Sequence, residues 1–181
     1  MSKRARRVMI GAAGVVLFTV AAGWALVAEA QGLDGMKKLV RVRFPDVPQL
    51  STQELSAWLQ DGRKPRPVLL DVRTKAEFDV SHLPGARRVD PDAKTADVAP
   101  MLEKGRPVVT YCSVGYRSSA MADRLRKAGV PQVSNLEGSI FQWANEGRPL
   151  EANGKPATKV HPYNDTFGKM LDAQRRANVR E

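Results

Sequence analysis

The sequence contains very little cysteine and histidine. Among its 181 residues there is one cysteine, Cys112, and there are two histidines, His82 and His161. A single cysteine cannot form an internal disulfide, and it excludes zinc and iron–sulfur centres that are held by cysteines alone. Internal repeats and low-complexity segments are also missing. The length therefore suits one compact domain with appendages.

Acidic residues are too few to balance the basic ones. The chain has 29 lysines and arginines against 19 aspartates and glutamates, for a formal net charge of +10. Such a balance is typical of proteins that meet nucleic acid, an anionic membrane surface or a small anionic substrate. The basic residues are spread along the chain, without a basic helix interleaved with aromatics and without an RNA-binding signature. We therefore expect no nucleic acid partner.

Charge is entirely absent from residues 8–28, which follow a cluster of four basic residues at the N-terminus. As a helix this run would span about 32 Å, enough for the apolar core of a bilayer. We predict that residues 1–30 form a hydrophobic helix that acts as a signal peptide or a membrane anchor. Ala28, Glu29 and Ala30 fit a signal-peptidase site, but the run is longer than most signal peptides, so cleavage near Ala30 and an uncleaved anchor both stay open. The adjoining basic cluster favours a domain outside the cytoplasm, which in a bacterium means the periplasm, anchored to the inner membrane or released.

The remaining chain divides into three parts. Residues 31–48 contain glycine, proline and mixed charge, and we predict a tether there. Residues 49–150 alternate between short apolar runs and amphipathic stretches, which predicts an α/β domain with a mostly parallel central sheet and helices on both faces. The expected strands cover 68–72, 87–90, 107–111 and 132–136, and the expected helices cover 51–61, 75–80, 96–104, 118–128 and a segment after Gly138. Residues 151–181 predict a basic tail whose short helix, with Phe167, Met170 and Leu171, packs back on the domain, the alternative being a helix that binds a partner.

Cys112 lies where an apolar strand is expected to end and a helix to begin, and ligands of α/β sheets bind at such carboxyl ends. The residues that follow can curl around the sulfur with their N–H groups inward, and the helix start adds a positive dipole end. Arg117 would add a full positive charge. Together these features stabilise a thiolate and predict a nucleophilic cysteine. The predicted site residues are Cys112, Ser113, Val114, Gly115, Tyr116, Arg117 and Ser118.

Residues 112–118, Cys-Ser-Val-Gly-Tyr-Arg-Ser, resemble the Cys-x-x-Gly-x-Arg-Ser loop of single-domain rhodaneses. Three further segments agree in order with that family: 70–73 with Glu77 and Phe78, 82–86, and 136–140 followed by Trp143. The resemblance covers roughly residues 49–149. Ser139 stands where the family often has a second glycine, and we expect it to cap the helix that begins there.

The resemblance implies a rhodanese-like fold and a two-step sulfur transfer. Cys112 would take a sulfane sulfur from thiosulfate or a similar small anionic donor as a persulfide, and pass it to a thiol or to cyanide. The backbone of residues 113–117 would cradle the substrate, and Arg117 would help bind its negative end. No metal and no cofactor are required, and the sequence identifies no protein partner.

The resemblance assigns supporting roles to other residues. Asp71 and Arg73 are expected to brace the loops around the site. His82 is expected to hold its Pro-Gly turn by hydrogen bonds, although a Cys–His pair in the domain could use only this histidine. His161 is given no role.

Two other functions remain open. A non-catalytic binding or regulatory module would not need the cysteine. A phosphatase or arsenate reductase of related fold would carry a Cys-x5-Arg loop, one residue longer than the Cys-x4-Arg loop formed here by Cys112 and Arg117. The tighter loop favours sulfur over a tetrahedral phosphate.

Overall fold

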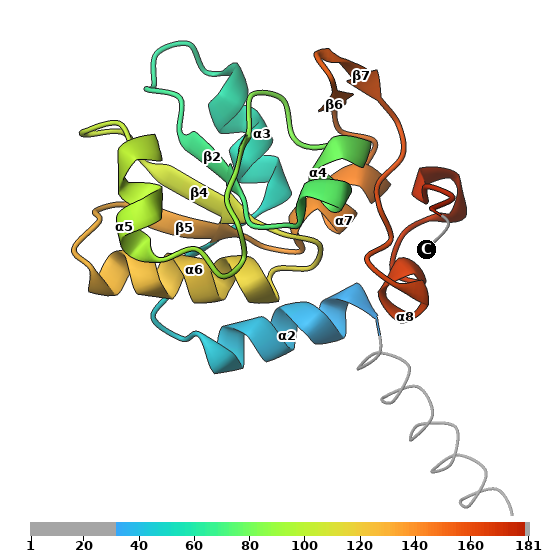
Figure 1. Ribbon diagram of the computed structural model, residues 1–181, viewed down its shortest axis with the longest axis horizontal. Helices are drawn as coiled ribbons and strands as arrows, with labels where there is room; N and C mark the ends of the chain where they lie inside the picture. The colour runs from blue at the N-terminus through green and yellow to red at the C-terminus, as the bar shows by residue number, and fades with distance from the viewer. Residues whose placement is uncertain (1–31, 180–181) are drawn as a thin grey trace, which may run out of the picture.

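A central sheet of five strands organises the protein (Figure 1). The computed structural model describes residues 32–179, so the predicted signal or anchor segment lies outside the described residues. The strand order is β1-β5-β4-β2-β3, and every neighbouring pair is parallel. The strands are β1 (Gln49–Leu50), β2 (Val68–Asp71), β3 (Arg87–Arg88), β4 (Val108–Tyr111) and β5 (Val133–Leu136). The predicted parallel sheet is confirmed, and β1 is a further edge strand that the sequence did not indicate.

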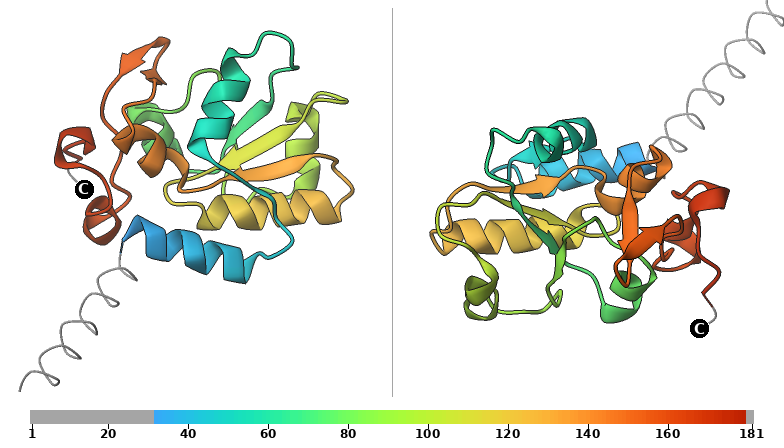
Figure 2. Two further views of the ribbon diagram at one scale, coloured as in Figure 1. Left: turned by 180° about the vertical axis from the view of Figure 1, so that it is seen from behind. Right: turned by 90° about the horizontal axis from the view of Figure 1, so that it is seen from above.

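Helices cover both faces of this sheet, as predicted (Figures 1 and 2). Strands β2 and β4 are buried at every position, because successive side chains point into two different cores. Leu69 and Val109 pack into one core, and Leu70 and Val108 pack into the other. The helices of the domain are α3 (Thr52–Gln60), α4 (Lys75–Val80), α5 (Thr95–Val98) with the 3-10 turn η1 (Ala99–Met101), α6 (Tyr116–Lys127) and α7 (Ser139–Asn145).

The predicted tether contains a helix instead. Helix α2 (Leu33–Arg43) packs against α6, with Val40 buried and Leu33 and Met36 packed against the core (Figure 1). Four basic residues are interleaved with these apolar positions, so the apolar spacing was hidden by the high charge. Among residues 32–179, no helix combines the length and the apolar character that crossing a bilayer requires.

The C-terminal tail folds back on the domain. It forms a hairpin of β6 (Leu150–Ala152) and β7 (Lys155–Ala157), followed by α8 (Asp165–Gly168) and the 3-10 turn η2 (Ala173–Arg175). Leu171 is buried in the core, and Phe167 and Met170 pack against it. The prediction that this tail packs on the domain is therefore confirmed, with a shorter helix than the apolar spacing suggested.

Candidate active site

Cys112 lies directly after β4 and four residues before the first turn of α6, at the carboxyl edge of the sheet. This position is the predicted one, although α6 begins at Tyr116, two residues before the expected start. Gly115 precedes the helix with φ of 108°, a conformation that side chains rarely adopt. The glycine therefore allows the chain to reverse tightly around the sulfur.

Hydrogen bonds to α7 fix the orientation of this loop. The backbone N–H groups of Ile140 and Phe141 donate to the carbonyl oxygens of Cys112 and Ser113, at 3.2 and 3.1 Å. These are amides of the first turn of a helix, which have no partner within the helix itself. With its carbonyls held toward α7, the loop turns amide groups toward the sulfur, and Gly115 N lies 3.2 Å from Cys112 Sγ.

The environment of Cys112 favours the thiolate. Burial alone would raise the pKa of this thiol, but the positive charge of Arg117 and hydrogen bonds from Ser118 and Gly115 bring the pKa below its ordinary value. The Ser118 hydroxyl also donates to Asn135 Oδ1 at 2.6 Å, which ties the start of α6 to β5. These contacts support the predicted nucleophilic cysteine.

Arg117 is held by a carboxylate that the sequence analysis did not assign to the site. Glu77, on α4, accepts two hydrogen bonds from Arg117 at 2.7 and 2.9 Å and one from Ser113 at 2.9 Å. Burial disfavours the charged carboxylate, but its hydrogen bonds with Arg117 and Ser113 outweigh this cost and lower the pKa of Glu77 to about 2. In the sequence, Glu77 was accounted for by the family pattern alone. Its capping box with Thr74 gives it a local role that would have hidden the distant one.

Asp71 and Arg73 form a fully buried ion pair beneath the site. Arg73 donates to both carboxylate oxygens of Asp71, at 2.8 and 2.6 Å, and to the Ser81 carbonyl at 2.6 Å. The pair thereby ties the end of β2 to the end of α4, the helix that carries Glu77. The expectation that Asp71 and Arg73 brace the loops around the site stays a prediction.

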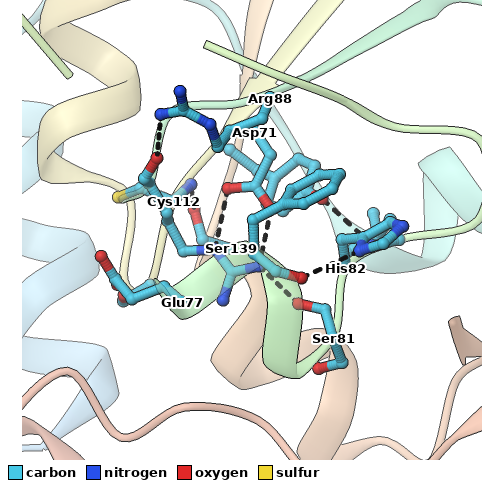
Figure 3. Close-up of polar contacts among 12 residues, drawn as sticks. Asp71, Glu77, Ser81, His82, Arg88, Cys112 and Ser139 are labelled. Carbon is cyan, nitrogen blue, oxygen red and sulfur yellow. Dashed lines mark hydrogen bonds and ion pairs between the residues drawn. The ribbon is translucent and has the colours of Figure 1, made fainter. Parts of the chain in front are cut away.

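Neither histidine contacts the sulfur through a hydrogen bond recorded within residues 32–179. His82 Nδ1 lies 3.0 Å from the Phe78 carbonyl and its ring stacks on Phe78, as expected of a residue that holds a turn. In Figure 3, Asp71 lies between Cys112 and His82. Burial lowers the pKa of His161, and Arg73 and Arg117 lower it further against an opposing effect of Glu77.

Ser139 does not cap α7. Gly138 occupies the capping position, and Ser139 is the first helical residue, with φ of 52°. Its hydroxyl accepts from Cys112 N at 3.2 Å and donates to the Leu136 carbonyl at 3.1 Å. The positive φ explains why glycine is common here in the family pattern. The serine adds a brace beneath the nucleophile that the sequence alone did not reveal.

A cavity of about 310 Å³ opens above Cys112. From the predicted site its lining includes Cys112, Ser113, Val114, Tyr116 and Arg117, whereas Gly115 contributes its amide and Ser118 lies buried behind the loop. The other lining residues are Met36, Leu39, Tyr163 and Phe167, which were not predicted. Within residues 32–179, no cluster of three or more His, Cys, Asp or Glu side chains is suited to hold a metal ion.

Comparison with known proteins identifies the family. The sequence pattern of the rhodanese-like domain family matches residues 51–146, more than half of the chain. The chain is a member of the rhodanese-like domain family. A protein named "Sulfurtransferase" from Allochromatium vinosum is 32% identical over 106 residues, which are 59% of this chain and 96% of that protein.

Larger relatives carry this domain as one part. The protein named "Probable adenylyltransferase/sulfurtransferase MoeZ" from Mycobacterium tuberculosis is 33% identical over 101 residues, 55% of this chain but only 25% of that protein. The crystal structure of thiosulfate sulfurtransferase from Pseudomonas aeruginosa superposes with a TM-score of 0.54 and 26% identity, covering 74% of this chain and 25% of that chain. The chain thus spans about a quarter of these two proteins.

Proposed function

We propose that this rhodanese-like protein is a sulfurtransferase in which Cys112 carries sulfur as a persulfide. The observation that carries the proposal is the Cys112 thiol at the end of β4, with a pKa below its ordinary value and Gly115 N at 3.2 Å from the sulfur. A lowered pKa provides thiolate, which is the nucleophilic form of cysteine. The sulfurtransferase among the relatives supports the same chemistry.

Two displacements complete the cycle. The Cys112 thiolate attacks the sulfane sulfur of a donor such as thiosulfate, a new S–S bond forms, and sulfite leaves with the electron pair of the broken bond. A thiolate or cyanide then attacks the outer sulfur of the persulfide, and Cys112 leaves as thiolate. No electrons are gained or lost overall, so no external oxidant or reductant is consumed.

Mass spectrometry of the intact protein tests this proposal. After incubation with thiosulfate or with an organic persulfide, we expect the mass of one added sulfur atom, which is lost again on addition of cyanide. Since Cys112 is the only cysteine, a Cys112→Ser variant provides a clean control that takes up no sulfur. A folded, reduced protein that takes up sulfur from neither donor would overturn the proposal.

We also propose that the domain acts outside the cytoplasm. The uncharged run 8–28 and the basic cluster before it support this location. An alkaline-phosphatase fusion after Glu181 should be active, because that enzyme needs an oxidising compartment for its disulfides. An inactive alkaline-phosphatase fusion together with an active β-galactosidase fusion at the same residue would place the domain in the cytoplasm.

A further inference from the structure

Segments outside the family match supply four of the nine residues that line the cavity above Cys112. Met36 and Leu39 come from α2, and Tyr163 and Phe167 come from the tail around α8. Figures 1 and 2 show the start of α2 beside α8, at the end of the sheet where α6 begins. The rhodanese-like match covers residues 51–146. These four lining residues therefore belong to the segments before and after the matched domain.

The cavity offers no unpaired cation among its lining residues. The loop positions that face it are Ser113, Val114 and Tyr116, and the only basic side chain in the lining is Arg117. Glu77 binds that guanidinium through two hydrogen bonds, and the Tyr163 ring covers it with its centroid 4.8 Å from Cζ. A compact inorganic anion would have to compete with the Glu77 carboxylate for the guanidinium of Arg117.

Apolar surface is concentrated at the same place. Within residues 32–179 four large apolar side chains are exposed, and three of them, Leu39, Tyr116 and Tyr163, line this cavity. Tyr163 has φ of 67°, which is unfavourable for an aromatic residue. Backbone strain of this kind persists where the surrounding structure holds it, often at a ligand site. Exposed apolar side chains gathered around a reactive atom mark a binding surface for an apolar ligand.

From these observations we propose that the substrate of this site is an organic sulfur compound with a small apolar carbon body: a thiol as acceptor, or its persulfide as donor. This inference rests on the proposed sulfurtransferase function. The acceptor thiolate attacks the outer sulfur of the Cys112 persulfide, the S–S bond to Cys112 breaks, and the organic persulfide leaves as Cys112 thiolate is restored. A cavity of about 310 Å³ lies at the small end of ligand pockets, which favours a small molecule over a protein segment.

A series of alkanethiols tests the inference. The protein is first loaded with inorganic polysulfide, and the rate of sulfur transfer is then measured to ethanethiol, propanethiol, butanethiol and pentanethiol, whose thiol groups are chemically alike. Each rate is divided by the rate at which the same thiol reacts with a small free persulfide in solution. This division removes differences in the intrinsic reactivity of the thiols. We expect the corrected rate constant to rise about two- to fourfold for each added methylene until the cavity is filled. Mercaptoethanesulfonate, which carries a second negative charge, should react more slowly than propanethiol.

Two variants on one helix separate the cavity from general surface effects. Leu39→Gln places a polar group in the lining and should flatten the dependence on chain length. Val42→Gln makes the same kind of change on α2 at a position outside the lining, where Val42 is 80% exposed, and should leave the dependence as it is. Leu39 is 49% exposed, so neither change should unfold the protein.

The possible failures are distinguishable. Loading of Cys112 followed by rates that do not depend on chain length, or that favour the sulfonate, would overturn this inference and leave the sulfurtransferase proposal standing. An equal effect of Leu39→Gln and Val42→Gln would also overturn it. Failure of every donor to load Cys112 would overturn both proposals.

Discussion

Replacing Glu77 by glutamine changes the stability of the domain and the reactivity of its cysteine through one removed charge. Glu77 is 1% exposed and accepts hydrogen bonds from Arg117 and Ser113. The difference between its pKa of about 2 and the ordinary value of 4.5 corresponds to about 3 kcal/mol of stability at neutral pH. Because 24% of the Arg117 side chain remains in contact with solvent, we expect the loss to be about 2–3 kcal/mol. For a domain of this size such a loss lowers Tm by about 5–10 °C.

The pH dependence provides a second test of the same carboxylate. A group with a depressed pKa stabilises the folded state above its unfolded value and loses that contribution as pH falls through the folded value. The wild-type protein should therefore lose the contribution of Glu77 as the pH falls from about 4.5 to about 2. Glu77→Gln should lack this component of acid unfolding, which urea titrations at several pH values would measure.

Glu77→Gln should make the Cys112 thiol more acidic while it destabilises the fold. Removing the carboxylate leaves the positive charge of Arg117 unopposed near the sulfur, so the pKa of the Cys112 thiol should fall further. Ultraviolet absorbance of the thiolate against pH reports this directly, since the chain has no other cysteine. The combination of lower stability and a more acidic thiol is specific to a charge that pairs with Arg117.

Asp79→Asn is the matched control. Asp79 lies on the same helix α4 and pairs with Lys75 at 2.5 Å, with more than half of both side chains exposed. An exposed pair of this kind contributes about 0–1 kcal/mol, and the thiol should titrate as in the wild type. The electrostatic reasoning would be refuted if Glu77→Gln and Asp79→Asn had equal effects, or if Glu77→Gln raised the pKa of Cys112.

Three further perturbations test other parts of the site. Gly115→Ala should lower the free energy of unfolding by about 1–3 kcal/mol and slow alkylation of Cys112 by iodoacetamide. The space around the residue is adequate, but φ of 108° strains any side chain. Unchanged unfolding and alkylation would contradict this. Asp71→Asn should cost about 3–5 kcal/mol in chemical denaturation, since it leaves the buried Arg73 guanidinium without its charge partner, and a loss below 1 kcal/mol would argue against a brace. His161→Gln should flatten the decline of stability below pH 6.5. The pKa of His161 is depressed in the folded state, so the unfolded chain takes up the proton first as the pH falls. An unchanged pH profile of Tm would refute this.

The sequence was informative wherever the signal is local. The capping box at Ser51 and Glu54, the boundaries of the helix 75–80 and the buried strand that ends before Cys112 are all present as expected. Each depends on residues within a few positions of one another or on a continuous apolar run. The predicted nucleophile and its loop rest on a signal of the same local kind, since their pattern lies within seven consecutive residues.

Contacts between distant segments could not be predicted in this way. Glu77 and Arg117 are separated by 40 residues, and the hydroxyl of Ser139 reaches the backbone of Cys112 across 27. Helix α2 was missed because lysines and arginines, most of them exposed, are interleaved with its apolar positions. The walls of the cavity depend on where α2 and the tail pack, which follows from tertiary structure and not from local spacing.

In the proposed sulfur-transfer cycle, the charge of the site is the same before and after sulfur is loaded. Glu77 and Arg117 offset one another, so the net charge near the nucleophile is set by the sulfur alone. A thiolate and a persulfide anion each carry one negative charge, and both can be stabilised by the loop amides and by the nearby guanidinium. Transfer therefore requires no change in the charge that the buried groups must support, and the Glu77–Arg117 pair can remain intact throughout the cycle. In this proposal, selectivity between substrates is left to the cavity above the sulfur, where α2 and the C-terminal tail supply apolar lining residues.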